Sequence, residues 1–451
     1  MLRLHDTARG RVVEVALRQP GRVGMYVCGP TVYGPPHLGH GRFAIVFDVL
    51  RRYLAWRGLE VDYVSNVTDI DDKILDRAAA EGRSWRDVAS EFEAQWWDAL
   101  AALEVLRPTR SPHASEYVDQ MVALVGELVG RGAAYETDDG VYLEVARVPG
   151  YGLLAHQSLE SLRAGARVEV REHKRSPADF ALWKKAKPGE PSWPSPWGPG
   201  RPGWHTECVV MALALLGEGF EIHGGGQDLA FPHHENERAQ AVALGRRFAG
   251  HWVHNGFVEV EGEKMSKSLG NYTTLPELVE HGQARAFRLL VLRAHYRSPL
   301  EVSEAALADA ASALERLDAL GRRFGEAPAP ASTDASRELV ETFREAMDDD
   351  LDTPRALALL FEALRRANGL ADSGERAPAA ALADGVVGCF AVLGLSPQRA
   401  APPDAAAREL LTRREAARIA RDFDLADRLR AEIEALGWRV EDTAQGPRLR
   451  R

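Results

Sequence analysis

The sequence predicts an α/β fold: a Rossmann-like parallel-sheet domain that carries an insertion, followed by an α-helical bundle and a small C-terminal domain. A short apolar strand, "GRVGMYVCGP", leads through a turn into the helical pattern "HLGHGRFAIVFDVLRRYLAWRG". The segment "LEVDYVSNVTDIDDKIL" repeats this order, and "GFEIHGGGQDL" is another strand that ends in a polar loop. Strands, polar loops and helices in alternation are typical of parallel sheets whose sites lie at the carboxyl ends of the strands.

The segments between and after these strands predict the remaining elements. Helices are expected from about Ser84 to Gly132, then a strand near Gly140 to Val145 and the Pro/Trp-rich loop "PGEPSWPSPWGPGRPGW". Beyond Tyr272 the pattern is helical, and two breaks at 325–334 and 395–404 have the composition of linkers. The predicted division is therefore residues 1–271 with an insertion at about 113–203, then 272–310, 311–398 and 405–451.

Composition limits the class of protein. The net charge of −10 argues against general coating of nucleic acid, yet residues 405–451 hold 11 Arg or Lys against 9 Asp or Glu, a net of +2. The sequence begins without an apolar run of signal-peptide length, and "VVMALALLG" is too short to cross a bilayer. We expect a cytoplasmic monomer without a membrane partner. With only three cysteines, a disulfide framework is not expected.

Two polar motifs can bind phosphates. "PPHLGH" (35–40) stands between the first strand and its helix, where backbone N–H groups and two imidazoles can stabilise an anion. "EKMSKSLGN" (263–271) places two lysines three residues apart, and flexible lysines can follow phosphates as they move. Taken by itself, the first motif could equally be the polar start of a helix without a binding role. The second could equally be a solvated turn.

The stretch "FPHHENERAQ" (231–240) is a candidate metal site. On a helix His233 and Glu237 share a face, whereas His234 and Glu235 point elsewhere. Cys28 ends the first strand and Cys208 begins a later helix, so both can reach one edge of the sheet. Two thiolates, an imidazole and a carboxylate suit zinc. The residues alone also fit two core cysteines and a helical His–Glu surface pair.

Together the motifs resemble those of the class I aminoacyl-tRNA synthetases, whose signatures look present at His37–His40 and Lys264–Ser268. The resemblance narrows to the cysteinyl-tRNA synthetase family through "MYVCGPTVY", "NVTDIDDKI", "GRPGWHTEC", "HGGGQDLAFPHHENE" and "KMSKSLGN". It continues to "RDFDLADRLRAEIEALGWRVEDTAQGPRLRR", which is similar to that family's anticodon-end domain, and so covers nearly the whole chain.

The resemblance implies a role for each matching residue. It implies one zinc ion, with ATP as a substrate accompanied by Mg²⁺, and L-cysteine and cysteine tRNA as the other partners. The implied zinc ligands are Cys28, Cys208, His233 and Glu237, and the zinc would take the sulfur of cysteine and exclude serine. The implied catalytic residues are His37, His40, Lys264 and Lys267. Pro30, Gly39, Gly224, Gly225 and Asp228 would join His37, His40 and Lys267 in binding ATP, and Thr68 and Trp204 would contact cysteine.

The implied reaction is activation of cysteine to an adenylate and its transfer to the 3′ end of tRNA. An alternative is the related ligase that joins cysteine to glucosaminyl-inositol in mycothiol synthesis; Lys73, the unbroken "HHENE" and the basic tail favour the synthetase. A non-catalytic tRNA-binding paralogue is disfavoured by the intact signatures. The chain departs from the family pattern at Gly34, where Asp is frequent, and at Leu449, where Trp is common and leucine offers no π-face to a base.

Overall fold

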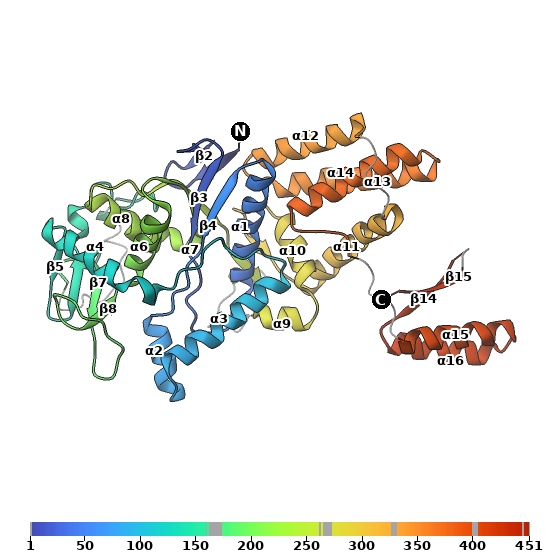
Figure 1. Ribbon diagram of the computed structural model, residues 1–451, viewed down its shortest axis with the longest axis horizontal. Coiled ribbons are helices and arrows are strands. Elements are labelled where there is room, and N and C mark those ends of the chain that lie inside the picture. Colours follow the sequence, from blue (N-terminus) through green and yellow to red (C-terminus); the bar gives the residue numbers. More distant parts are fainter. Residues whose placement is uncertain are drawn as a thin grey trace. The chain divides into compact units, whose positions relative to one another are not determined.

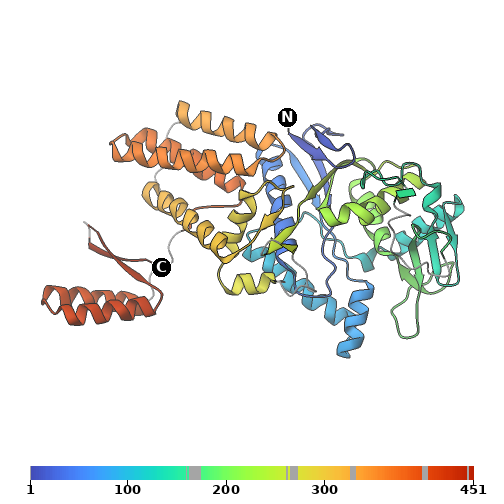
Figure 2. The same ribbon diagram turned by 180° about the vertical axis from the view of Figure 1, so that it is seen from behind.

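A computed structural model describes residues 2–158, 160–161, 174–260, 263–264, 273–325, 332–398, 405–443 and 446–450. The chain divides into two compact units (Figures 1 and 2). One comprises residues 1–317 and 326–396, and the other comprises residues 318–325 and 397–451. The first unit contains every described residue of the predicted site, and the four predicted domain ranges stay predictions.

The centre of the first unit is a four-stranded parallel sheet. Its strand order is β10 (Ala249–Asn255), β9 (Phe220–Gly226), β3 (Arg22–Val27) and β4 (Glu60–Val64). Tyr26 of β3 pairs with both Val64 and His223, so the carboxyl ends of the three strands lie at one edge. The sheet and its crossovers confirm the predicted α/β class.

Helices cover this sheet on two sides. α1 (Leu38–Trp56) packs so closely on β9 that a Cβ added at Gly224 would lie 2.3 Å from the ring of Phe47. α6 (Trp204–Leu216) and α8 (Glu235–Ala243) pack together on the side where Tyr26 and Cys28 join a shared apolar core. Each helix begins at the carboxyl edge of the sheet, which turns its first residues toward the predicted site.

The segment between the halves of the sheet is largely helical and then forms its own sheet, drawn in cyan to green in Figure 1. Its helices are α2 (Asp72–Glu81), α3 (Trp85–Ala102) and α4 (Val118–Gly130). An antiparallel sheet follows in the order β5 (Ala134–Glu136), β6 (Gly140–Leu143), β7 (Phe180–Lys185) and β8 (Gly200–Pro202). β5 and β6 form a hairpin through residues 137–139, and β6 lies where the sequence predicted a strand, near Gly140 to Val145.

The part of the first unit after β10 begins with short strands and becomes helical, as predicted. β11 (Val258–Val260) pairs with β12 (Glu263–Lys264) and β13 (Leu300–Glu301). A separate hairpin near the N-terminus consists of β1 (Arg3–Asp6) and β2 (Arg11–Glu14). The helices are α9 (Leu275–Glu280), α10 (Ala284–Arg293), α12 (Asp334–Asp348), α13 (Thr353–Asp372) and α14 (Arg376–Val392), together with α11 (Glu304–Phe324) as far as Leu317.

The second unit has a small core of its own. α15 (Ala405–Ile419) and α16 (Phe423–Ala435) pack against each other, and β14 (Arg439–Thr443) pairs with β15 (Gly446–Arg450). Trp438 is buried in this core, and Leu449 packs against the same cluster opposite Val440. Leu449 therefore serves packing within the unit. Among the described residues, no helix combines the length and apolar character needed to cross a bilayer.

Candidate active site and metal cluster

Four potential metal ligands meet at the carboxyl edge of the parallel sheet: Cys28, Cys208, His233 and Glu237. Their ligand atoms all lie within 4.8 Å of one another, and all four side chains are buried. Sγ of Cys28 lies 3.7 Å from Sγ of Cys208 and 3.3 Å from Oε1 of Glu237. Nε2 of His233 lies 2.8 Å from the same carboxylate oxygen and 3.6 Å from Sγ of Cys208. The structure thus places the four predicted ligands in one group, which we call the cluster.

Local structure explains how distant residues reach this point. Cys28 directly follows β3, and its N–H donates to the carbonyl of Gly224 on the neighbouring strand. Cys208 lies in the second turn of α6. His233 belongs to the helical turn η3 (Ala230–His234), and Glu237 lies one turn further on at the start of α8. Two helix starts and one strand end therefore supply all four groups.

Other histidines surround the cluster, and one corrects the sequence analysis. His234 was predicted to point away, but its Nε2 lies 3.3 Å from Sγ of Cys28 because that thiol comes from the strand beneath the helix. His223 approaches Glu237 with Nε2 2.5 Å from Oε2, and its Nδ1 lies 3.0 Å from the carbonyl oxygen of Tyr26. Glu235 does point elsewhere, accepting the N–H of Leu154.

A second group of four, Cys28, His223, His234 and Glu237, also has its ligand atoms within 4.8 Å. It shares two members with the cluster but offers one thiol rather than two. Since soft thiolates select zinc over the hard cations, the cluster is the better site for a soft metal. His223 is then placed to orient the carboxylate of Glu237 from behind, as outer hydrogen-bond partners commonly do.

Electrostatics of the cluster favour a cation. The hydrogen bond with Cys28 lowers the pKa of Cys208 to about 6, whereas burial raises the pKa of Cys28 well above its ordinary value. Burial opposes ionisation of Glu237, but His223 and His233 outweigh it and hold the carboxyl pKa well below its usual range. Burial likewise opposes the charge on His233, yet Glu237 and Cys208 raise its pKa to about 10. A metal ion would displace the protons of His233 and Cys28.

A cavity of about 380 Å³ opens beside the cluster and contains many of the predicted nucleotide residues. Its volume is within the range of small-molecule sites. Cys28 forms part of its wall, so the cluster and this cavity, which we call the signature cavity, are continuous. The other lining residues are Gly29, Pro30, Thr31, Tyr33, His37, Gly39, His40, Phe43, Lys73, Trp204, Gly226, Asp228, Leu229, Asn255, Gly256, Phe257 and Val258.

The two signature histidines stand together at the beginning of α1. His37 occupies the N-cap position, and its ring stacks on that of His40 with 3.7 Å between the centroids. The N–H of His37 donates to Nδ1 of His40 at 3.2 Å, and Trp96 meets His40 edge-on. Helix N-termini favour anions, so this end of the signature cavity suits a phosphate.

The predicted cysteine-pocket residues have different surroundings. Trp204 lines the signature cavity with 36 % of its surface exposed, and its ring centroid is 4.1 Å from that of His233. Thr68 is buried and does not line that cavity. Its hydroxyl donates to Glu207 and accepts from Asn66, each at 3.1 Å. Thr68 is therefore placed to act through Asn66, which accepts the N–H of Gly29.

Four other predicted residues are not placed at the wall of the signature cavity. Gly224 and Gly225 are buried, and the structural need for glycine there is packing: a Cβ at Gly225 would lie 2.9 Å from the ring of His234. The backbone of Lys264 is in β12, but its side chain is outside the described residues, as is the whole of Lys267. Of the predicted residues in the glycine segment, Asp228 does line the cavity, as does the neighbouring Gly226.

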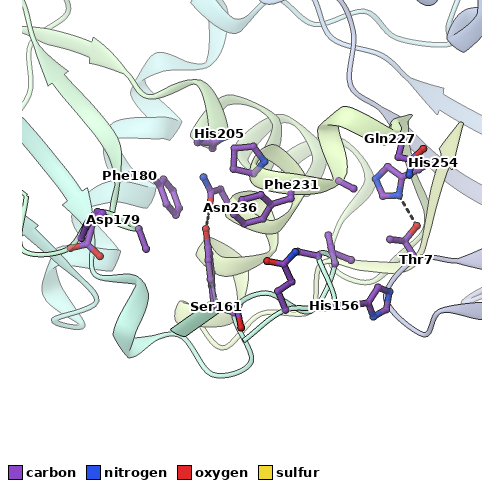
Figure 3. Close-up of a pocket in the computed structure, with 18 of the residues that line it drawn as sticks. Thr7, His156, Ser161, Asp179, Phe180, His205, Gln227, Phe231, Asn236 and His254 are labelled. Atoms are coloured by element: carbon purple, nitrogen blue, oxygen red, sulfur yellow. Dashed lines mark hydrogen bonds between the residues drawn. The ribbon is translucent and has the colours of Figure 1, made fainter. Parts of the chain in front are cut away.

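A larger cavity of about 1,150 Å³ lies on another side of the cluster, between the insertion and the parallel sheet (Figure 3). We call it the insertion cavity. His205 and His254 line it. Nδ1 of His205 is 2.8 Å from Nδ1 of His233, a member of the cluster, and Nε2 of His254 is 2.8 Å from Nδ1 of His234, which lies beside the cluster. Neither residue was predicted from the sequence. A signal existed for His205, because "WHTEC" places it three residues before Cys208 at a predicted helix start.

Residues 14–312 match the family model described as "tRNA synthetases class I (C) catalytic domain", and residues 342–397 match the "DALR domain". A protein named Cysteine–tRNA ligase from Halorhodospira halophila is 47% identical over the full length of both chains. Another of that name from Thermotoga maritima is 44% identical over 99% of each.

Solved structures share the fold at low identity. The methionyl-tRNA synthetase of Mycobacterium tuberculosis bound by methionyl-adenylate has a TM-score of 0.62 at 15% identity, covering 83% of this chain and 90% of its own. A ternary complex of a leucyl enzyme, the LeuRS of Agrobacterium radiobacter, has a TM-score of 0.61 at 12% identity over 85% of each chain. These likenesses establish the fold.

Proposed function

The chain belongs to the cysteine–tRNA ligase family of class I tRNA synthetases, and we infer from this that it is a ligase that attaches cysteine to tRNA with ATP. The observation that carries the inference is the continuity of the cluster with the signature cavity. Cys28 belongs to both, so a substrate sulfur at the cluster and a phosphate at the start of α1 can belong to neighbouring molecules in one site. An enzyme that activates a thiol-bearing amino acid needs this juxtaposition.

We propose zinc for the cluster, held by Cys28, Cys208, His233 and Glu237. The donor set supports this assignment, because two sulfurs, one imidazole and one carboxylate are all buried within 4.8 Å of one another. Bound zinc would supply a Lewis acid that prefers the sulfur of cysteine as thiolate to the hydroxyl of serine. Discrimination of this kind can be large enough to make a separate editing step unnecessary.

The proposed chemistry has two steps. In the first, a carboxylate oxygen of cysteine attacks the α-phosphorus of ATP; the bond to the bridging oxygen breaks and pyrophosphate leaves with Mg²⁺. In the second, a hydroxyl of the terminal ribose of tRNA attacks the carbonyl carbon of the adenylate. An ester forms, AMP leaves and the hydroxyl proton passes to its phosphate or to water. The protein's part in both steps is to position the reactants and stabilise charge.

We assign the phosphate end of the site to the start of α1. His37 and His40 line the signature cavity there, and the helix N-terminus adds its N–H groups. Lys73 brings a further positive charge to the wall, lying 5.0 Å from the ring centroid of Tyr33. Lys264 and Lys267 are proposed to approach the triphosphate from the other side, and Asp228 to accept a hydrogen bond from the ribose or the amine of adenosine.

We further propose that cysteine tRNA binds through the matched DALR domain and the basic C-terminal segment. Residues 405–451 carry a net positive charge in a chain of net charge −10. The negatively charged tRNA is therefore attracted to this segment more than to the rest of the chain. The enzyme is proposed to work as a monomer in the cytoplasm, where its product enters translation.

The test is a charging assay with ATP, labelled cysteine and either cysteine tRNA or glucosaminyl-inositol as acceptor. We expect label on tRNA only. Label on the amino sugar alone would mean that the proposed acceptor is wrong and that the proposed activation site is still correct. Cysteine-dependent exchange of pyrophosphate into ATP reports on the first step alone. If this exchange is absent, the proposal that the chain is a cysteine-activating enzyme is rejected. Lys267→Ala should slow this exchange; an unchanged rate would remove that lysine from the mechanism.

A further inference from the structure

A buried carboxylate in the helical part of the first unit holds two other segments. Asp350 lies in the loop between α12 and α13, and 5 % of its surface is exposed. Its Oδ1 accepts hydrogen bonds from the N–H of His5 and from the hydroxyl of Tyr296, each at 2.7 Å. Its Oδ2 accepts from Nε of Arg297 at 2.9 Å and from a second nitrogen of that guanidinium. Asp350 therefore joins the loop to strand β1 and to residues 295–298, which we call the support segment.

The loop that carries Asp350 has a strained backbone. Asp350 and Leu351 have φ of 59° and 53°, a left-handed conformation that residues other than glycine, asparagine and aspartate rarely adopt. Two such residues in succession persist only where the surrounding contacts fix them, and strain of this kind is concentrated at functional sites. The N–H of Asp350 adds one such contact by donating to the carbonyl oxygen of Arg3 at 2.9 Å. The loop is thus locally strained while its carboxylate stays in a defined position.

The support segment in turn contacts one wall of the signature cavity. The N–H of Gly256 donates to the carbonyl oxygen of Tyr296 at 2.8 Å. A Cβ added at Gly256 would lie 2.6 Å from each of two carbonyl oxygens of the support segment, so this close approach of the two backbones requires glycine. Residues 255–258 line the signature cavity, and β13, which follows the support segment, pairs with β11 from Val258 onward. Movement of the support segment would therefore move this wall.

Helix α1 also binds the support segment. Arg42 donates to the carbonyl oxygens of His295, Tyr296 and Ser298, and to that of Phe257 in the cavity wall. Arg42 follows the signature histidine His40 by two residues in α1. Asp350 thus fixes side chains of the support segment, whereas Arg42 fixes its carbonyl groups. The carboxylate, the cavity wall and the start of α1 are all connected through this one segment.

Resting on the proposed function, we propose that Asp350 is a positioning residue for the activation step, which acts through the support segment to set the distance between residues 255–258 and the phosphate end of the signature cavity. Asp350 is not among the residues that line this cavity, so its effect on ATP is indirect. The cluster, where cysteine is proposed to bind, is built from other segments of the chain. Loss of the Asp350 carboxylate should therefore weaken the binding of ATP and leave that of cysteine unchanged.

The first experiment compares Asp350→Asn with Asp349→Asn. Asparagine has the size of aspartate, but it removes the charge and replaces one acceptor oxygen by an NH₂ donor. Asp349 is the matched control because it lies in the same loop, with 51 % of its side chain exposed, and pairs with Arg3 at the surface. In pyrophosphate exchange, Asp350→Asn should raise KM for ATP about five- to fiftyfold and keep kcat and KM for cysteine within about twofold, while Asp349→Asn matches the wild type. Partial unfolding lowers kcat without changing KM, so a fall in kcat with an unchanged KM for ATP would overturn the proposal.

The second experiment measures the equilibrium binding of a non-hydrolysable ATP analogue and needs no catalysis. Asp350→Asn, Arg42→Met and the double variant are compared with the wild type. Because both residues hold the support segment, the loss of affinity in the double variant should be at least about threefold smaller than the product of the two single losses. Single losses that simply multiply in the double variant would overturn the proposal.

Tyr296→Phe covers the case in which Asp350→Asn does not fold. It removes one hydrogen bond to Asp350, keeps the buried ring and changes no charge. The analogue should bind this variant about two- to tenfold more weakly than the wild type, and equal affinity would overturn the proposal. If the wild type binds the analogue but shows no cysteine-dependent exchange, the proposed function fails while these binding comparisons still decide the role of Asp350. A wild type that binds no analogue would overturn both.

Discussion

Arg42 offers a prediction that links the fold to the active site. It is fully buried in α1, just after the signature histidines, and no carboxylate pairs with it among the ion pairs of the described residues. Its guanidinium instead donates to the carbonyl oxygens of Phe257, His295, Tyr296 and Ser298. Burial lowers the pKa of Arg42 to about 10, so it remains charged at neutral pH. One side chain therefore ties α1 to the residue before β11 and to the loop before β13.

Replacing Arg42 with methionine keeps the apolar stem and removes these bonds. A hydrogen bond from a charged group contributes about 1.5–3 kcal/mol, and a buried carbonyl left without a partner costs about 1–3 kcal/mol. Tyr296 is buried, whereas Ser298 is exposed enough for water to replace the guanidinium. We expect a net loss of about 3–5 kcal/mol, or roughly 6–10 °C in the midpoint of thermal unfolding. Phe257 also lines the signature cavity, so kcat/KM for ATP in pyrophosphate exchange should fall about ten- to a hundredfold.

Arg288→Met is the matched control. Arg288 is equally buried and pairs with Asp48, but its other bonds go to the carbonyls of Leu103 and Leu393, away from the signature cavity. Removing one partner of a buried pair costs about 3–5 kcal/mol, so its melting point should fall by a similar amount. Its exchange kinetics at 25 °C should match the wild type. The reasoning would be refuted if Arg42→Met kept its melting point, or if Arg288→Met lost as much exchange activity.

Three further outcomes follow from the structure. Cys208→Ser should purify with less than about a tenth of the wild-type zinc, whereas the control Cys389→Ser should keep all of it, as measured by elemental analysis. Full zinc in Cys208→Ser would favour the second ligand group, Cys28, His223, His234 and Glu237. Gly224→Ala should lose about 1–3 kcal/mol in urea unfolding, because its Cβ would lie 2.3 Å from an aromatic ring of α1; an unchanged midpoint would contradict that packing. The hydrogen bond between His113 and Glu93 raises the pKa of the histidine above 6.5 and lowers that of the glutamate below 4.5. The pair therefore contributes its full stability between about pH 4.5 and 6.5. This contribution is lost as the pH rises through the raised histidine pKa or falls through the lowered carboxyl pKa. The loss of unfolding free energy caused by His113→Asn should accordingly be smaller at pH 9 than at pH 6.

The sequence was a good guide to the fold because its strands are short, apolar and followed by polar turns. The order of β3, α1 and β4 could be predicted from local patterns alone. The pairing of β3 with β9 could not, because nearly two hundred residues separate them and periodicity carries no information about which strands become neighbours. The expectation of one Rossmann-like sheet split by an insertion supplied that step, and the parallel register of Tyr26 with His223 confirms it.

The site was predicted less completely than the fold. The four cluster residues were identified because their types fit zinc and because the resemblance matched them. His223 and His254 were missed, since each is a single histidine in an apolar strand and the sequence does not reveal that both strands end at the cluster. His234 was assigned to the wrong side because helical periodicity describes one helix, whereas the thiol of Cys28 approaches from beneath it. The adenosine role of Gly224 stays a prediction; the structure adds a packing reason for glycine there, because a Cβ would meet the ring of Phe47.

One backbone feature connects the two cavities. The extended conformation of Phe231 interrupts the helical run and sends consecutive parts of η3 in different directions, Phe231 into the insertion cavity and His233 to the cluster. A substitution that restored a regular helix here would therefore disturb metal binding and the insertion cavity together. Tyr151 and Arg297 line the insertion cavity from other elements and do not belong to the cluster. Changes at these two positions should consequently leave the donor groups of the cluster in place, and the zinc content of the purified variants should equal that of the wild type.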